Sequence, residues 1–178
     1  CTIFKPNTKE AKEMSGCSDW KQQCDYFERN VGCQAIIITQ GGKGVFYVDD
    51  SVVARKQIER TLQSLDVRGY SAINGRRAWE ELDKMASYAE ATHSKMLDHV
   101  QVILTDVEMP EMDGYMLTKK IKSDSRFQGI PVVMHSSLSS MSNKKLGQSV
   151  GVDEYVHKFQ PDKLAETLTR LLTGESQS

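Results

Sequence analysis

Short hydrophobic runs alternate with longer amphipathic stretches along most of the chain. The runs are rich in β-branched residues, as strands are, and in the stretches between them apolar residues recur three or four positions apart, as on one face of a helix. We expect strands at residues 45–48, 66–73, 100–104, 132–135 and 154–157, and helices from Ser51, over 76–91, 115–122 and 142–150, and from Pro161. Strands and helices that alternate in this way predict an α/β fold, in which helices cover both faces of a parallel sheet and the crossovers are right-handed.

The third run, residues 100–104, is the most informative. It is almost uninterrupted and reads as a central strand that is buried on both faces. It leads directly to Asp106, which we therefore expect at the carboxyl edge of the sheet, where open α/β sheets bind their ligands. Aspartate is also common at the start of a turn. Taken alone, Asp106 could equally be a residue that starts the turn or a residue of a functional site.

The ends of the other strands change this balance. Asp49 and Asp50 follow the first strand, Ser136 follows the fourth and Lys158 follows the fifth. Each has an ordinary explanation, since Asp50 can cap a helix, Ser136 can form a turn and Lys158 can face solvent. The carboxyl ends of parallel strands share one edge, however, so we expect these side chains to meet beside Asp106. Together they are the residue types that a phosphoryl site needs.

The chemistry of such a cluster is specific. Three neighbouring carboxylates repel one another, and a Mg²⁺ ion, which prefers oxygen ligands, relieves that repulsion. Lys158 provides a positive charge for a phosphoryl oxygen, and Ser136 provides a hydroxyl for another. Asp106 then has the surroundings of a nucleophile whose product is an acyl phosphate.

The combination of Asp49-Asp50, Asp106 with the following Val-Glu-Met-Pro-Glu-Met-Asp-Gly, Ser136 and Lys158 closely resembles the receiver domain of two-component response regulators. The resemblance covers about residues 44–174. It implies a flavodoxin-like (βα)5 doubly wound sheet of strand order 2-1-3-4-5. It also implies that Asp106 takes a phosphoryl group from a phosphohistidine of a sensor kinase.

The resemblance further implies ligands and a switch. Mg²⁺ would be held by Asp49, Asp50, Asp106 and the backbone carbonyl of Glu108. Ser136 and Tyr155 would move together on phosphorylation and reshape a protein-binding face made by the fourth helix, the fifth strand and the fifth helix. These roles rest on the resemblance to the family alone.

Within this family, the stretches around Asp106, Met134 and Lys158 look like the receivers of chemotaxis coupling proteins of the CheV class. That likeness implies a CheA-like histidine kinase as a partner, with the chemoreceptor array or motor-side proteins as further partners. The sequence departs from many receivers at Phe159, where proline usually follows the lysine. We therefore do not expect a cis peptide bond directly after Lys158.

The first 43 residues differ in composition from the rest of the chain. They contain all four cysteines, Cys1, Cys17, Cys24 and Cys33, at spacings that do not favour a metal site. We expect helices at 8–14 and 20–30 and a strand at 34–39. The stretches 6–11 and 36–46 resemble part of a ribokinase-like (PfkB) sugar kinase, without that family's catalytic Gly-Ala-Gly-Asp. We expect an N-terminal extension at 1–43, a receiver domain at 44–174 and a tail at 175–178.

Composition narrows the partners and the setting. Hydrophobic residues make up 39% of the 178 residues, charged residues 26%, and the net charge is −1. This balance provides no electrostatic reason to expect nucleic acid or an anionic membrane as a partner, and no apolar run is long enough to span a bilayer. A cytoplasmic protein without membrane insertion is the expectation.

Two other functions fit parts of the pattern. One is a receiver-like module that binds proteins without being phosphorylated. The other is a phosphatase of the haloacid dehalogenase type, which forms an aspartyl phosphate but needs a second aspartate two positions after the nucleophile, where this chain has Glu108. A signalling domain that is not a turnover enzyme therefore remains the leading hypothesis.

Overall fold

The computed structural model describes residues 3–4, 15–16, 35–36, 44–137 and 141–174. The chain divides into two compact units, Cys1–Gly42 and Lys43–Ser178. In the first unit, β1 (Ile3–Phe4) pairs in parallel with β2 (Ala35–Ile36). The helices expected at 8–14 and 20–30 and most residues of the sugar-kinase resemblance lie outside the described residues, so the assignment of this extension stays a prediction.

The second unit is built on a five-stranded parallel sheet. Its strands are β3 (Gly44–Val48), β4 (Arg68–Ala72), β5 (Val102–Thr105), β6 (Val132–Ser136) and β7 (Glu154–His157). They lie side by side in the order β4-β3-β5-β6-β7, and each neighbouring pair is parallel. Counted from β3 this is the order 2-1-3-4-5, which confirms the expected doubly wound sheet.

Five α-helices follow the strands of this unit. They are α3 (Val52–Ser64), α4 (Gly75–Ala91), α5 (Gly114–Ser123), α6 (Met141–Val150) and α7 (Pro161–Thr173). Several begin where a polar side chain accepts a backbone N–H of the first turn, as Asn74 does from Arg77 and Asp113 from Met116, both at 2.8 Å. The five helices that the sequence predicted after residue 44 are all present, with ends within a few residues.

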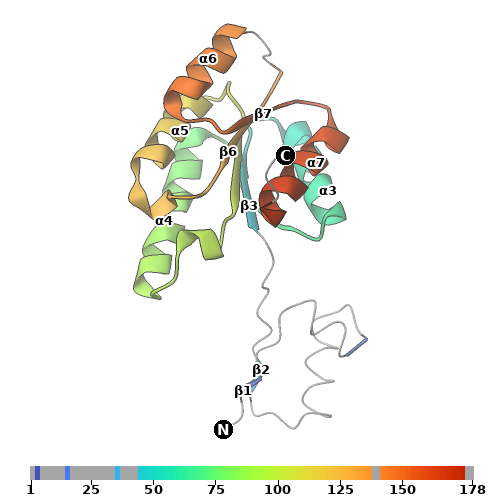
Figure 1. Ribbon diagram of the computed structural model, residues 1–178, viewed down its shortest axis with the longest axis vertical. Helices are drawn as coiled ribbons and strands as arrows, with labels where there is room; N and C mark the ends of the chain where they lie inside the picture. The colour runs from blue at the N-terminus through green and yellow to red at the C-terminus, as the bar shows by residue number, and fades with distance from the viewer. Residues whose placement is uncertain (1–2, 5–14, 17–34, 37–43, 138–140, 175–178) are drawn as a thin grey trace. The chain divides into compact units, whose positions relative to one another are not determined.

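The helices form two layers around the sheet (Figure 1). Helices α3 and α7 pack on one face, where Ile58, Leu62, Leu164 and Leu168 meet inward residues of the strands. Helices α4, α5 and α6 cover the other face, with Leu82 and Leu117 among the buried residues. Because β3, β5 and β6 are buried on both faces, their carboxyl ends are fixed against one another. That edge carries the candidate site.

The largest departure from the expected elements lies before β5. Residues 100 and 101 precede the strand, and a short 3₁₀ helix, η1 (Met96–Asp98), occupies the polar stretch in front of it. The N–H of Val100 donates to the carbonyl of Met96 at 2.9 Å. Val100 therefore belongs to the end of that turn, and the strand begins only at Val102. A single 3₁₀ turn has no periodic pattern, so sequence reasoning did not find it.

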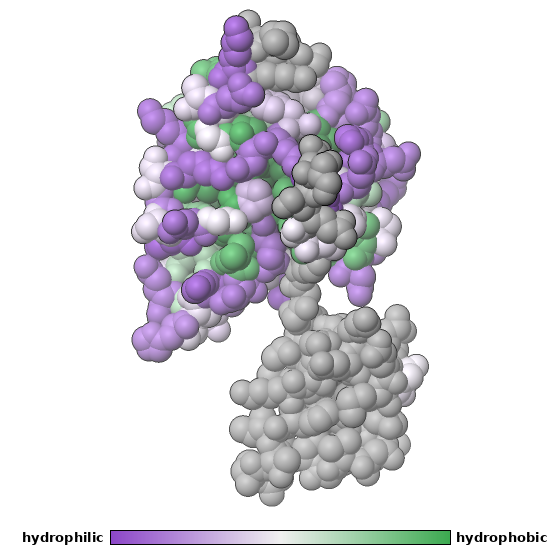
Figure 2. Space-filling model, viewed as in Figure 1, coloured by the Kyte–Doolittle hydropathy of each residue, from purple (hydrophilic) through white to green (hydrophobic). Residues whose placement is uncertain are grey.

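The surface of this unit is mixed. Figure 2 shows hydrophilic residues over most of the visible face, with hydrophobic residues exposed between them on the side of α4 and α5. Val52, the first residue of α3, is 56% exposed. Within the described part of the chain, the helices are too short or too polar to cross a membrane.

Candidate functional site

Asp106 lies directly after β5, and its carboxylate is held on both oxygens. The N–H of Val107 donates to Oδ1 at 2.7 Å, and the ammonium of Lys158 donates to Oδ2 at 2.7 Å. The residue is 5% exposed, and the following turn is so close that a Cβ on Gly114 would overlap the Asp106 carbonyl oxygen. Glycine at 114 therefore permits the turn that presents this carboxylate.

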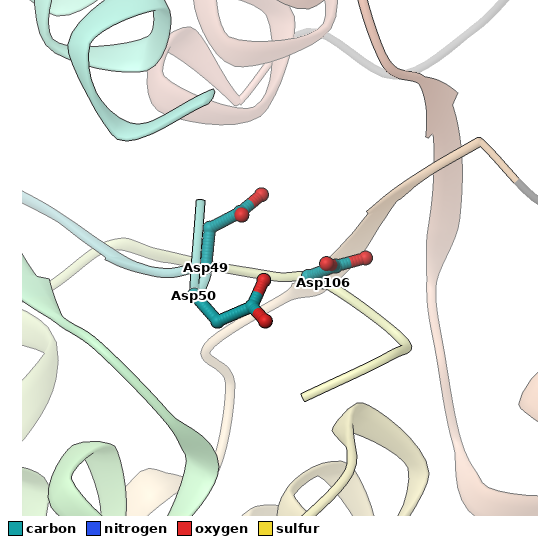
Figure 3. Close-up of side chains that lie close together, drawn as sticks. All are labelled: Asp49, Asp50 and Asp106. Carbon is teal, nitrogen blue, oxygen red and sulfur yellow. The ribbon is translucent and has the colours of Figure 1, made fainter. Parts of the chain in front are cut away.

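Asp49 and Asp50 approach Asp106 from the neighbouring strand. Both residues follow β3 directly in the sequence. One oxygen of each of the three carboxylates lies within 4.8 Å of the others (Figure 3). Asp49 is almost fully buried, and its Oδ1 accepts the N–H of Ser51 at 2.9 Å. Asp50 is exposed. The cluster thus opens to solvent on the Asp50 side.

Arg55 holds the backbone of the acidic loop. It lies one turn into α3, and its Nη1 donates to the carbonyl of Asp49 at 2.7 Å and to the carbonyl of Asp50 at 3.1 Å. These bonds fix the backbone of the acidic pair and place a positive charge next to it. Sequence reasoning missed Arg55 because an arginine on the first turns of a helix is ordinarily a solvated residue.

Lys158 completes the charged cluster from the end of β7. Its Nζ lies 2.8 Å from Oδ2 of Asp49 and 2.7 Å from Oδ2 of Asp106, and the residue is 9% exposed. Burial lowers the pKa of Lys158, but the two carboxylates outweigh that effect and raise the pKa above its usual range. The lysine is therefore charged at neutral pH and bridges the two buried carboxylates.

The electrostatics of the cluster favour a cation. Burial raises the pKa of Asp106, only partly opposed by the bonds from Lys158. Three carboxylates and one ammonium leave negative charge unbalanced, and the buried Oδ2 of Asp49 has to share the Lys158 ammonium with Asp106. A small divalent cation with oxygen ligands fits this donor set. Asp49, Asp50 and Asp106 are the side chains that would hold it.

The two other predicted site residues lie at the rim. Ser136 ends β6, is 4% exposed, and its carbonyl accepts the N–H of Lys158 at 3.1 Å, so the serine and the lysine are adjacent. Glu108 is exposed in the loop between β5 and α5. The roles of the Ser136 hydroxyl and the Glu108 carbonyl stay predictions.

Tyr155, the predicted switch residue, points into a niche on α6. Its hydroxyl donates to the carbonyl of Asn143 at 2.9 Å, so it is bound to the backbone of the first turn of that helix. A Cβ on Gly147 would overlap the hydroxyl. The hydroxyl of Tyr115 reaches the same carbonyl at 3.2 Å. Burial raises the pKa of Tyr155 to about 12.

His135 is a second residue that the sequence did not single out. It lies next to Ser136 on β6, is 3% exposed, and its Nδ1 has no hydrogen-bond partner among the described residues. Burial, followed by the positive charge of Lys158 and the nearby His157, lowers the pKa of His135 to about 4. The imidazole is therefore neutral at physiological pH, and a histidine in an apolar strand gives no sequence signal for this state.

Known proteins resemble this unit in sequence. A family model for the response regulator receiver domain matches residues 45–169. Chemotaxis protein CheY1 of Helicobacter pylori is 36% identical over 130 residues, which is 70% of this chain and 93% of that protein. Chemotaxis protein CheV2 of the same organism is 34% identical over 134 residues, 75% of this chain. The chain spans 40% of the length of CheV2.

Solved structures agree with these relatives. The chemotaxis response regulator CheY4 of Vibrio cholerae superposes with a TM-score of 0.59 at 30% identity, covering 73% of this chain and 98% of that one. The receiver domain of a signal transduction histidine kinase from Syntrophus aciditrophicus superposes with a TM-score of 0.62 at 26% identity, covering 76% and 94%. The residues that the family model matches lie within the unit that carries Asp106.

Proposed function

The chain belongs to the response regulator receiver domain family, and on that premise we propose that Asp106 accepts a phosphoryl group from a phosphohistidine of a sensor kinase. The observation that carries this proposal is the position of Asp106. It stands at the carboxyl edge of a central strand, beside two further carboxylates and a buried lysine. Receiver domains are signalling domains and not classical enzymes, so the product is a modified protein that changes its partners.

The proposed reaction needs positioning more than proton transfer. An oxygen of the Asp106 carboxylate attacks the phosphorus, a P–O bond forms, and the P–N bond to the donor histidine breaks, so that the electron pair returns to the imidazole. The Val107 N–H fixes the orientation of the carboxylate through Oδ1. In this proposal Lys158 pairs with an oxygen of the incoming group and the Ser136 hydroxyl bonds another; the contact of Lys158 with Asp106 and its backbone bond to Ser136 support these roles.

We propose Mg²⁺ as the resident ion. The buried Oδ2 of Asp49, the exposed Asp50 and Asp106 match its preference for oxygen ligands together with retained water, and the carbonyl of Glu108 is the fourth proposed ligand. When bound, the ion neutralises charge on the phosphoryl oxygens. Arg55 supports this arrangement by holding the backbone of the acidic pair.

The proposed output is a change in the face formed by α6, β7 and α7. Ser136 ends β6 and Tyr155 lies on the neighbouring β7, where Met134 pairs in register with Tyr155. A Ser136 hydroxyl drawn toward a phosphoryl group on Asp106 would vacate space on that side of β6. In this proposal the Tyr155 side chain moves into the space that Ser136 leaves. That movement would alter the surface that partner proteins contact.

The CheV and CheY relatives suggest where this receiver works. We propose a CheA-like histidine kinase as the phosphodonor, with chemoreceptor-array or motor-side proteins as further partners, in the cytoplasm. The similarity to CheV2 covers only 40% of that protein. We therefore do not propose that this chain couples to receptors.

The test uses the full chain with a small phosphodonor such as acetyl phosphate and MgCl₂, followed by intact mass. We expect the mass of one phosphoryl group on the protein, and its loss in Asp106→Asn. Asp66→Asn is a matched control, because Asp66 is a residue outside the site with a φ of 54° that asparagine also tolerates. Modification that survives in Asp106→Asn would refute the assignment of the phosphoacceptor.

The same experiment separates the alternatives. A chain that stays unmodified and shows no Asp106-dependent spectral response to beryllofluoride with Mg²⁺ would be a phosphorylation-independent interaction module. Steady release of phosphate over many turnovers would indicate a phosphatase. The Lys158 bridge between Asp49 and Asp106 suits both reactions that form an aspartyl phosphate, so turnover is what separates the receiver from the phosphatase.

A further inference from the structure

A groove runs between α4 and α5, away from the phosphoryl site. It has a volume of about 960 Å³, and its base is formed by Trp79 and Met112, which are half-buried and pack against the core. Met116 lies beside them and is 55% exposed. An exposed methionine next to a tryptophan is an adaptable apolar surface of the kind that binds protein segments. The groove is open along the surface, so it suits a chain segment better than a small molecule.

The groove also has a wall of positive charge. Met116, Lys119, Lys120 and Ser123 follow one another along α5 at helical spacing and all line it. Lys120 lies over the ring of Trp79, with Nζ 4.4 Å from the ring centre. Cations and apolar surface are thus interleaved in one place.

These two lysines are not neutralised by their neighbours. In the described part of the chain, neither Lys119 nor Lys120 has a carboxylate within ion-pair distance. The acidic side chain that lines the groove, Asp124, is bound by Arg126 at 2.7 Å. The groove therefore has an excess of positive charge in a chain whose net charge is −1.

The base of the groove is connected to the loop that carries Asp106. Met112 lies in the β5–α5 loop, and α4 approaches it so closely that a Cβ on Gly75 would overlap the Met112 carbonyl oxygen. Asn74 donates to Glu111 of the same loop at 2.9 Å. These contacts make the groove a firm part of the fold, formed before any partner arrives.

We propose that this groove binds an amphipathic helix of a partner protein, whose apolar stripe meets Trp79, Met112 and Met116 and whose flanking carboxylates meet Lys119 and Lys120. An apolar base between two helix walls suits the helix-in-groove mode of recognition. The positive wall selects acidic over basic helices. The binding does not require transfer to Asp106, so it stands or falls independently of the proposed phosphorylation.

Trp79 provides the readout. The chain has two tryptophans, so Trp20→Phe leaves Trp79 as the sole reporter. The full chain is titrated with a synthetic helix that carries leucine at every third or fourth position and glutamate on both sides of that stripe. We expect a saturable change in Trp79 emission, and affinity at least about tenfold weaker in Lys119→Glu/Lys120→Glu. A second synthetic helix with lysine in place of glutamate should bind the parent chain far more weakly.

The matched control is Lys56→Glu/Lys163→Glu. Both residues are exposed, lie on α3 and α7 across the sheet, and change the net charge by the same amount. This variant should bind the acidic helix as the parent does. Equal loss in both double variants would show a general charge effect and overturn the proposal. Equal binding of the acidic and basic helices, or no saturable signal, would overturn it as well.

Discussion

Two clusters of polar side chains in the receiver unit are held together by different interactions. Around Asp106, three carboxylates and Lys158 are forced together by the ends of three strands, and the cluster is held by charge. Around Tyr155, the cluster is neutral: two tyrosine hydroxyls share the carbonyl of Asn143. The first leaves negative charge that the proposed cation would balance. The second leaves no charge, and is made possible by a missing Cβ at Gly147.

This difference explains how each cluster responds to a disturbance. Removing one charge from the first leaves buried ions without a partner, which is expensive because water cannot replace it. Removing one hydroxyl from the second costs a single neutral hydrogen bond, which is worth about 1 kcal/mol. Steric change, in contrast, affects the tyrosine niche most. Substitutions at Lys158, His135 and Gly147 test this contrast, in order of decreasing effect.

Lys158→Met is expected to have the largest effect on stability. Methionine keeps the length of the side chain but leaves the carboxylates of Asp49 and Asp106 buried side by side, 1% and 5% exposed. In EDTA we expect the free energy of unfolding to fall by about 3–5 kcal/mol. Addition of MgCl₂ should recover part of it, since a cation then binds between the carboxylates. Urea denaturation with and without Mg²⁺ measures both values.

The control for this prediction is Lys163→Met. Lys163 is exposed on α7 and forms a surface pair with Glu166, so its loss should change stability by less than about 1 kcal/mol. A loss in Lys158→Met that is the same in EDTA and in Mg²⁺ would mean that the lysine acts through packing, and that charge does not hold the first cluster together.

The position of the charged cluster could be predicted from the sequence, whereas the roles of its members stay predictions. Asp49, Asp50, Asp106, Ser136 and Lys158 all lie at the ends of strands, and the parallel topology brings such residues to one edge. The sheet order followed from the same residues through their resemblance to receivers. The position of the site therefore depends on residue type and strand ends, both of which can be read along a single sequence.

The tyrosine niche was not predictable in the same way. Tyr155 was named as a switch residue, but its partners Tyr115, Asn143 and Gly147 lie on two other helices. Nothing in the spacing of these residues relates one to another. From the sequence, Gly147 is only a residue of low helix propensity in a short helix. The structure shows that the Tyr155 hydroxyl fills the space beside it.

His135 lies next to the charged cluster, but its imidazole is neutral at physiological pH. Burial and Lys158 lower the pKa of His135 from 6.5 to about 4. Between these values the unfolded chain binds a proton that the folded chain does not, so the free energy of unfolding falls as pH drops from about 6.5 to 4. The full effect of this shift is about 3 kcal/mol.

The measurement compares urea denaturation at pH 7 and about pH 4.5 for the parent chain and for His135→Leu. Leucine fills a similar volume and cannot titrate, so the variant should lose less stability on acidification. Because the pKa of Asp106 is raised, that group acts in the opposite direction, and only the difference between the two chains reports His135. Parallel pH profiles would mean that the imidazole titrates normally.

Gly147→Ala addresses the neutral cluster and should have a smaller effect. The added Cβ overlaps the Tyr155 hydroxyl, so the ring must leave the niche or α6 must shift, at a cost of about 1–3 kcal/mol for overpacking. Alanine favours a helix over glycine by about 1 kcal/mol, which offsets part of that cost. We therefore expect a net loss of up to about 2 kcal/mol in urea denaturation.

The same substitution in a Tyr155→Ala background decides whether the niche is the reason. With the hydroxyl gone, the methyl group at 147 meets no obstacle, and only the helix preference remains, so Gly147→Ala should become stabilising by up to about 1 kcal/mol. Such a change of sign arises only if the glycine exists to admit the tyrosine. An equal loss in both backgrounds would place the obstacle elsewhere on α6, and Tyr155 would then be free to leave its inward position without any change at residue 147.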